Sequence, residues 1–433
     1  MFDNKVELMD IKAKLVIIGD GIAGLSLAYI AAQRGIRAAV LGKNLKGTTH
    51  SATGLIAPRP DYLLSDSELV RQTSVECLRF AKTFGPEVLK RRQFLIPTYS
   101  GFPVNTGNLN VLLSLYDEVA RSRFDNFERH DFISSSVLEK MEPNLRKNRF
   151  GGAFSVAEWT VDPAVLLRKL DNEAVIFLGK TRRFDIGELD GFHIQNGVIR
   201  EVRAVFADGN SVRISNNSEP LAVVNTAGPW MKDVCASLGL TMNYQLRTGL
   251  QIEFPGWYFQ SGIIMFDKNG KYLICLQKNG SIQVGPTNSP FSGHPSQFSE
   301  SIGDINSLVT PFLELLEDGK IPKISAMRHG FRVKSTYTDT NRPVIWRHAT
   351  DGPMNFYSLH PGKMALALRA ADEMLDVLAS NGWIRKTVIC AKSPIHLEGD
   401  KGLRNEAKLL WLKAVSLFKL AIYFIKFKIK TPW

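Results

Sequence analysis

The sequence predicts a mixed fold, α/β together with α+β: a Rossmann-like domain with an inserted antiparallel-sheet domain and a C-terminal amphipathic helical tail. Three observations lead to this fold class. The apolar run Leu15–Ile18 passes through a glycine-rich turn into an apolar helical segment, the pattern of a buried parallel strand and its following helix. Residues 241–290 contain several strand-like runs. Residues 401–433 combine basic with apolar side chains.

The glycine-rich turn has the spacing Gly-x-Gly-x-x-Gly. Gly19 permits the tight turn, Gly21 lets a pyrophosphate approach the backbone, and Gly24 lets the helix pack closely on the strand. The first amides of the helix would then face the phosphates. A glycine ends the helix and residues 36–41 form a second apolar strand, which completes one βαβ unit. The stretch therefore predicts a dinucleotide site.

One usual part of such a site is missing. About 20 residues after the glycines, where the second strand ends, a carboxylate normally accepts hydrogen bonds from the adenosine ribose. Here the chain reads Gly42-Lys43-Asn44. Backbone groups near Gly42, or the side chains of Lys43 and Asn44, would have to replace that acceptor. A Gly-Lys pair would also suit a 2′-phosphate, which leaves NADP as an alternative.

The loop after this unit, residues 47–59, is rich in small and hydroxyl side chains that can donate hydrogen bonds to phosphate and ribityl oxygens. Further along, Asp162 and Pro163 predict the N-cap and first position of a helix to Asn172. The buried run 221–224 ends in another small-residue turn and predicts a return to the first sheet. Hairpin turns are expected at Asp190-Gly191, Asn196-Gly197 and Asp208-Gly209, and helices over 65–93, 109–125, 136–142 and 302–317.

Composition excludes several classes of protein. The chain has 433 residues and a net charge of +12, but +7 of that charge lies in residues 401–433, which argues against a nucleic-acid groove across the body. The four cysteines are far apart and no two histidines stand at metal-ligand spacing, so neither a disulfide framework nor a metal site is expected. The N-terminal residues are partly acidic without an apolar signal region, which predicts a cytoplasmic protein.

The tail has the pattern of a basic amphipathic helix. Its apolar stretches are too short to span a bilayer, but the helix would suit burial at a membrane interface. The alternative is a helix packed on the body or on a partner subunit. We expect the protein to be peripheral on the inner face of the cell membrane. The basic stripe would contain Arg404, Lys408, Lys419, Lys426 and Lys430.

Taken together, these motifs resemble the FAD-dependent oxidoreductases of the D-amino-acid oxidase and glycerol-3-phosphate dehydrogenase superfamily, over about residues 12–385. The segments that carry the resemblance are 19–24, 48–56, 160–163, 225–230, 247–251, 330–332 and 361–363. The turn Pro361-Gly362-Lys363 before a helix looks most like that of glycerol-3-phosphate dehydrogenases, although Pro361 replaces a glycine and the expected downstream arginine is displaced to Arg369.

The resemblance implies noncovalent FAD. Lys363 or a helix N-terminus would stabilise the negative charge of the reduced flavin. His50 lies near the position where some relatives attach flavin covalently, but its spacing is one residue off. The implied cofactor-binding residues are Gly19, Asp20, Gly21, Ile22, Ala23, Gly24, Gly42, Lys43, Thr48, Thr49, Ser51, Gly54, Leu55, Phe184, Ala227, Gly228, Gly330, Arg332, Pro361, Gly362, Lys363 and Met364.

An anionic substrate needs cations, and arginine pairs best with a carboxylate or phosphate. Arg332 is the first candidate because the resemblance implies a substrate-anchoring arginine in its segment; Arg59, Arg247 and Arg342 are secondary. His360 is the candidate base for a substrate hydroxyl; alternatively it satisfies backbone groups at the helix entrance.

The resemblance implies a dehydrogenase that passes electrons from a small anionic substrate, such as glycerol 3-phosphate, to quinone or a partner. An oxygen-using amine oxidase of the glycine or sarcosine oxidase type and a non-catalytic flavin subunit are the alternatives. The expected FAD domain comprises 1–90, 150–235 and 325–395; the substrate domain comprises 91–149 and 236–324; the tail is 401–433.

Overall fold

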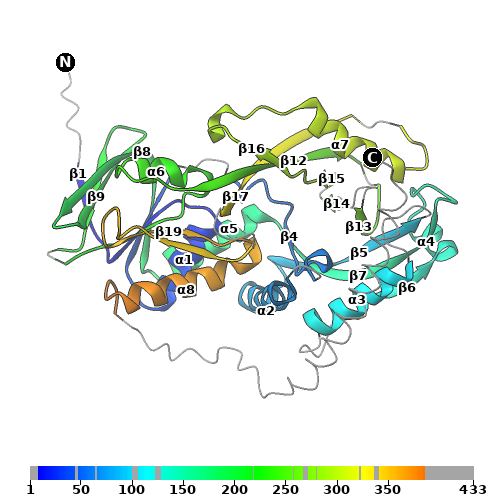
Figure 1. Cartoon of the computed structure of the whole chain (residues 1–433), viewed down its shortest axis with the longest axis horizontal. Coiled ribbons are helices and arrows are strands. Elements are labelled where there is room, and N and C mark those ends of the chain that lie inside the picture. The colour runs from blue at the N-terminus through cyan, green and yellow to red at the C-terminus, as the bar shows by residue number, and fades with distance from the viewer. Residues whose placement is uncertain are drawn as a thin grey trace, which may run out of the picture.

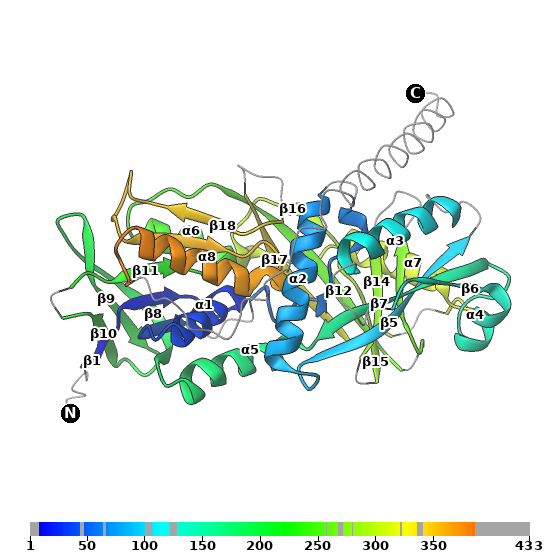
Figure 2. The same cartoon turned by 90° about the horizontal axis from the view of Figure 1, so that it is seen from below.

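The computed structural model shows an elongated molecule with one large sheet at each end (Figures 1 and 2). The predicted tail and Asn44 lie outside the described residues. Within the part of the chain that is described, no helix is long and apolar enough to cross a membrane. The structure describes residues 8–43, 47–63, 66–99, 106–121, 128–217, 219–256, 258–266, 272–278, 280–320, 323–335 and 341–385.

The first sheet has nine strands. Its centre, β8-β3-β2-β11-β19, is parallel, and every residue of β2, β3 and β11 is buried. The pairing of β11 with β2 confirms the predicted return of residues 221–224 to this sheet. In spatial order the strands are β1 (Leu8–Lys12), β10 (Ser211–Ser215), β9 (Val198–Phe206), β8 (Thr181–Gln195), β3 (Ala38–Gly42), β2 (Leu15–Ile18), β11 (Ala222–Asn225), β19 (Phe356–His360) and β18 (Val344–Arg347).

Helices cover one face of this sheet. Helix α1 (Ile22–Gln33) is apolar all round because it packs between the sheet and helix α8 (Ala367–Ser380), which lies along it (Figure 1). Helix α5 (Pro163–Asn172) packs beside α1, and the Asp162 side chain caps it as predicted. On the opposite face, side chains of β2 and β11 form a second apolar cluster with side chains of β9, β10 and helix α6 (Met231–Ala236).

The second sheet has ten strands. Its order is β16 (Ser289–Phe291), β12 (Tyr244–Pro255), β15 (Ser281–Gly285), β14 (Tyr272–Lys278), β13 (Gly262–Phe266), β5 (Leu89–Tyr99), β7 (Phe150–Val161) and β4 (Leu55–Ile56); β17 (Ala326–Ser335) also pairs with β12, and β6 (Asp131–Ser134) with β7. All of these pairs are antiparallel except β13–β5. Helix α7 (Ile302–Leu315) packs on it, with Phe312 stacked 4.9 Å from Phe254 between ring centroids. Helices α3 (Thr106–Arg121) and α4 (Ser135–Met141) complete this end.

Two expected elements are wrong in extent or type. The helix expected over 65–93 ends early: α2 spans Ser67–Phe84, Gly85 follows with φ +74°, and β5 begins at Leu89. The expected hairpin at Asp190-Gly191 is instead a register irregularity inside β8, which continues to Gln195. Here the glycine, with φ +145°, serves a bulge rather than a chain reversal. The turns at Asn196-Gly197 and Asp208-Gly209 are confirmed.

Candidate active site

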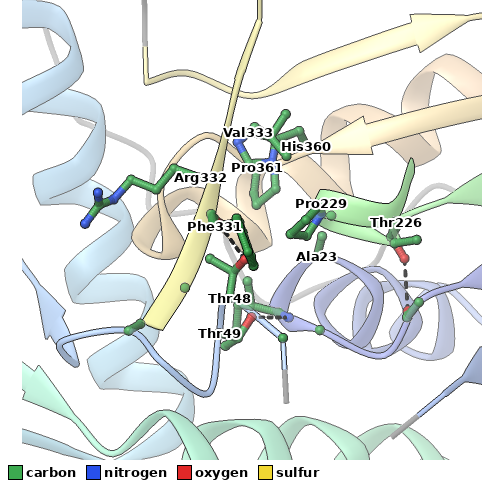
Figure 3. A pocket seen from close by; sticks show the side chains of 18 of the residues that line it. Ala23, Thr48, Thr49, Thr226, Pro229, Phe331, Arg332, Val333, His360 and Pro361 are labelled. Atoms are coloured by element: carbon green, nitrogen blue, oxygen red, sulfur yellow. Dashed lines mark hydrogen bonds between the residues drawn. The ribbon is translucent and has the colours of Figure 1, made fainter. Parts of the chain in front are cut away.

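A cavity of about 990 Å³ is lined by residues of both sheets. Its wall includes the turn between β2 and α1, the hydroxyl-rich loop before β4, the segment that follows β11, strand β17, and the turn that follows β19. Figure 3 shows these segments converging, although they come from widely separated parts of the chain.

The three glycines of the turn have different roles. A Cβ atom on Gly24 would lie 1.9 Å from the Gly19 carbonyl oxygen, and one on Gly19, whose φ is +115°, would lie 2.6 Å from the Thr226 oxygen. These two glycines therefore allow the backbone segments to pack. A Cβ atom on Gly21 would meet only the Thr49 Oγ1, at 3.4 Å. Gly21 is thus the position that a ligand can approach closely.

Threonine hydroxyls fix the loops around this turn (Figure 3). The Ile22 amide, at the start of α1, donates to Thr49 Oγ1 at 3.1 Å. Thr226 Oγ1 donates to the Gly19 carbonyl at 2.9 Å, and Thr48 Oγ1 donates to the Phe331 carbonyl on β17. The loop that the sequence assigned to the cofactor is therefore bonded both to the helix N-terminus and to the second sheet.

Gln251 on β12 is a cavity residue that the sequence reasoning did not select. Its side chain is 2% exposed, and its Nε2 donates to the Ser51 carbonyl at 2.7 Å. Its Oε1 has no hydrogen-bond partner among the described residues. A buried acceptor on a cavity wall can take a hydrogen bond from a bound molecule or from an ordered water. The available signal was its place in segment 247–251, one of the segments that carry the family resemblance.

The open backbone at Gly21 and the N-terminus of α1 suit the phosphates of a dinucleotide cofactor. The unpaired Gln251 oxygen suits a polar edge of its ring system. Pyrophosphate oxygens suit the amides at the start of α1. The residues present are therefore compatible with FAD.

Cations surround Tyr62 at another part of the cavity wall. The Lys363 Nζ lies 3.5 Å from the Tyr62 ring centroid, and the Arg59 guanidinium carbon lies 4.8 Å from it. Both distances are within the range of cation–π contacts. Arg59 has φ +68°, in the left-handed region that is uncommon for a residue with a side chain. Strain of this kind is typical of positions that are held by a functional site.

Arg332 completes this group, which we call the cationic cluster (Arg59, Arg332 and Lys363 around Tyr62). Its Nη1 donates to the Thr287 carbonyl at 3.0 Å. Burial lowers the pKa of the Arg332 guanidinium, and the nearby charge of Arg59 lowers it further. Arginine nevertheless stays charged, so the cluster is a partly desolvated set of positive charges on the cavity wall.

His360 lies on the other side of β17 from Arg332. Side chains alternate along a strand, and Figure 3 shows Arg332 extending away from His360, which lies beside Val333 and Pro361. Burial lowers the pKa of His360 to about 4, partly offset by a hydrogen bond with the Val333 backbone. The imidazole is therefore neutral at neutral pH. Both predicted catalytic residues line the cavity, but the structure does not bring them together.

Most predicted cofactor residues line the cavity, as do Arg59, Arg332 and His360. Gly24 and Gly54 pack against backbone instead: a Cβ atom on Gly54 would lie 2.1 Å from the Val161 oxygen. Phe184 packs against Phe206, with ring centroids 6.1 Å apart, while the neighbouring segment 186–189 lines the cavity in its place. Gly42 lies behind the Asp20 side chain.

Two predicted substrate arginines belong to other contacts and are not cavity-lining residues. Arg342 forms an ion pair with Asp66, the N-cap of α2, at 2.7 Å. Arg247 donates to the Asn288 side chain at 2.8 Å and to its carbonyl at 2.7 Å. Their charges are engaged outside the cavity, so neither is retained as a substrate ligand below.

The fold and the cavity are those of a flavin-dependent oxidoreductase. The family model described as "FAD dependent oxidoreductase" matches residues 14–371. The chain belongs to this family, and FAD is its cofactor.

Two curated relatives are named aerobic glycerol-3-phosphate dehydrogenase. The protein of Staphylococcus saprophyticus is 26% identical over 296 residues, which cover 66% of this chain and 51% of that protein. The protein of Staphylococcus haemolyticus is 24% identical over 409 residues, covering 87% of this chain and 68% of that protein. The chain thus spans about half the length of the first relative and about two thirds of the second.

Solved structures with different activities share the fold. The glycerol-3-phosphate dehydrogenase of Bacillus halodurans complexed with FAD matches with a TM-score of 0.65 and 16% identity, covering 87% of this chain and 66% of that one. The glycine oxidase of Bacillus cereus matches with a TM-score of 0.60 and 17% identity, covering 85% of this chain and 95% of that one. The fold alone therefore does not select the substrate.

Proposed function

We propose that this protein is an FAD-dependent dehydrogenase that oxidises a small anionic substrate, most like glycerol 3-phosphate to dihydroxyacetone phosphate, and passes the electrons to quinone or a protein partner. Bound FAD, held noncovalently, would supply the hydride acceptor. The proposal includes a peripheral association with the membrane through the tail, which would bring the flavin near a membrane electron acceptor.

The observation that carries the proposal is the cationic cluster. Positive charges gathered on a cavity wall attract an anion, and guanidinium groups match phosphate or carboxylate geometry. The cluster lines the same cavity as the glycine turn, so one molecule bound there can meet both the cofactor and the cations. The names of the two curated relatives favour a phosphate over a carboxylate as that anion.

In this proposal His360 accepts the substrate hydroxyl proton. Its neutral imidazole is the form that can accept a proton, but a pKa of about 4 makes it a weak base in the form described. Substitution of His360 by Gln should therefore slow flavin reduction without weakening substrate binding. If His360 only supports the Val333 backbone, the same substitution should lower thermal stability and leave the reduction rate of folded protein unchanged.

The direct test is anaerobic flavin reduction. The full chain is purified in mild detergent, and glycerol 3-phosphate, a 2-hydroxy acid, glycine and sarcosine are added separately while flavin absorbance is recorded. Bleaching by glycerol 3-phosphate alone supports the proposal. Bleaching by glycine or sarcosine would replace it with the amine oxidase, the second candidate. A flavin that none of the four reduces would contradict both functions.

Membrane association has a separate test. A variant that lacks residues 401–433 should leave the membrane fraction in cell fractionation if the tail is the anchor. Retention of the truncated protein in that fraction would exclude this role.

A further inference from the structure

The Asp20 side chain occupies the space into which the expected carboxylate at residue 42 would extend. Gly42 ends β3, the position from which an acidic side chain usually reaches the adenosine ribose. A Cβ atom on Gly42 would lie 2.4 Å from the Asp20 Cγ, 2.4 Å from its Oδ2 and 2.8 Å from its Cβ. The Asp20 side chain therefore fills the path through which a side chain at residue 42 would leave the backbone.

Neighbouring charges hold the Asp20 carboxylate in this place. Its Oδ2 accepts a hydrogen bond from Arg183 Nη2 at 3.0 Å, and the Asp20 side chain is 19% exposed. Arg183 also donates to Asp171 at 2.9 Å and to Asp185 at 3.0 Å. One guanidinium therefore serves three carboxylates. Of these carboxylates, Asp20 is the one whose residue lines the cavity.

We propose that Asp20 is the acceptor for the adenosine ribose hydroxyls of FAD, supplied from the glycine turn instead of from the end of the second strand. An ionised carboxylate has about four acceptor sites, of which the bond from Arg183 occupies one. In FAD this ribose is joined directly to the pyrophosphate, and Asp20 directly precedes Gly21, where the backbone is open to the cavity. A ribose diol provides the two donors that such an acceptor needs.

The same arrangement bears on the choice of cofactor. The excess negative charge around Asp20, Asp171 and Asp185 would repel a 2′-phosphate, because like charges at short range disfavour one another. The Gly42-Lys43 pair left NADP open as an alternative, and the position of Asp20 counts against it.

The test measures nucleotide binding, independently of any substrate. FAD release from the full-length holoprotein is followed by flavin fluorescence while ADP or 2′,3′-dideoxy-ADP competes for the site. The natural protein should prefer ADP by about tenfold, the size expected for hydrogen bonds to a charged acceptor. In Asp20→Asn, FAD and ADP should bind about tenfold more weakly, with dideoxy-ADP unchanged, so that the preference disappears.

Asp171→Asn is the matched control because it also removes a partner of Arg183 but lies outside the cavity lining. It should keep the preference for ADP. Gly42→Glu alone should bind FAD poorly because the new side chain meets Asp20, whereas Asp20→Gly combined with Gly42→Glu should regain the preference. If Asp20→Asn keeps the preference, or weakens both nucleotides equally, Asp20 supports the turn only and the proposal is overturned.

Discussion

Two regions of one cavity are built over very different distances along the chain. The glycine turn comes from a single βαβ unit, β2-α1-β3. Its Gly24 packs against backbone within the unit, and its Gly19 packs against backbone at the end of the neighbouring strand β11. The cationic cluster joins Arg59 and Tyr62 from one loop to Arg332 on β17 and Lys363 after β19. The first region depends mainly on local backbone geometry, whereas the second forms only when both sheets are in place. The motif typical of the family is therefore local, whereas the cations that we propose for the substrate depend on long-range packing.

Gly24→Ala should have the largest effect, because its new Cβ would lie 1.9 Å from the Gly19 carbonyl oxygen. That oxygen is a backbone atom of the same turn, so it cannot move aside as a flexible side chain could. We expect the free energy of unfolding to fall by about 3 kcal/mol or more, with loss of bound flavin. Chemical denaturation of the apoprotein and flavin absorbance measure the two effects. Gly21→Ala is the matched control: its Cβ has only an ordinary contact, so the fold should persist while FAD affinity falls. Equal stability losses in the two variants would contradict the separation of roles.

Arg332→Gln should damage the other region without releasing the flavin. We expect kcat/KM for the anionic substrate to fall by about 100-fold, through the loss of a charged hydrogen-bond donor from a partly desolvated site. Steady-state kinetics measure the fall, and the flavin spectrum serves as the check on cofactor binding. Arg247→Gln is the control, since Arg247 pairs in register with Arg332 across β12 and β17 but does not line the cavity. Similar losses of kcat/KM in both variants would mean that the two arginines support the β12–β17 strand pair and that Arg332 does not bind the substrate directly.

This contrast also explains how much the sequence could predict. Apolar runs and glycine spacing are local, and they correctly predicted β2, α1, β3 and the return of β11 to the first sheet. Arg342 was a secondary candidate for substrate binding, and nothing in its own segment reveals its partner Asp66, which is 276 residues away. The contact of Tyr62 with Lys363 was missed for the same reason. Which charge faces the cavity depends on strand register and long-range packing, and sequence patterns do not specify either.

Glu76→Gln would sharpen the comparison by changing a buried charge that does not line the cavity and should affect stability alone. Glu76 is 6% exposed on α2, and burial raises its carboxyl pKa to about 6. A raised pKa means that the folded state favours the protonated form, so stability is fully present below about pH 4.5 and is lost as pH rises through 6. The substitution should be neutral near pH 4 and stabilise the protein by about 1–2 kcal/mol at pH 7. Thermal unfolding of both proteins across this pH range tests the sign; a constant difference would contradict it.

Arg342→Gln should have the smallest effect, and it separates an ion pair of the fold from the cationic cluster. Partial burial works against ionisation of Asp66, but hydrogen bonds from Arg342 and from the Leu69 amide outweigh it and hold the Asp66 pKa below its usual value. A lowered pKa adds stability above the unfolded value of about 4, which is lost as pH falls through the folded value. Because the pair is partly solvated, we expect a loss of only about 0.5–1 kcal/mol at pH 7 and none in strong acid. Denaturant unfolding at the two pH values measures this loss, and KM should stay close to that of the natural protein. A rise in KM as large as that of Arg332→Gln would return Arg342 to the substrate site and remove the distinction between the two arginines.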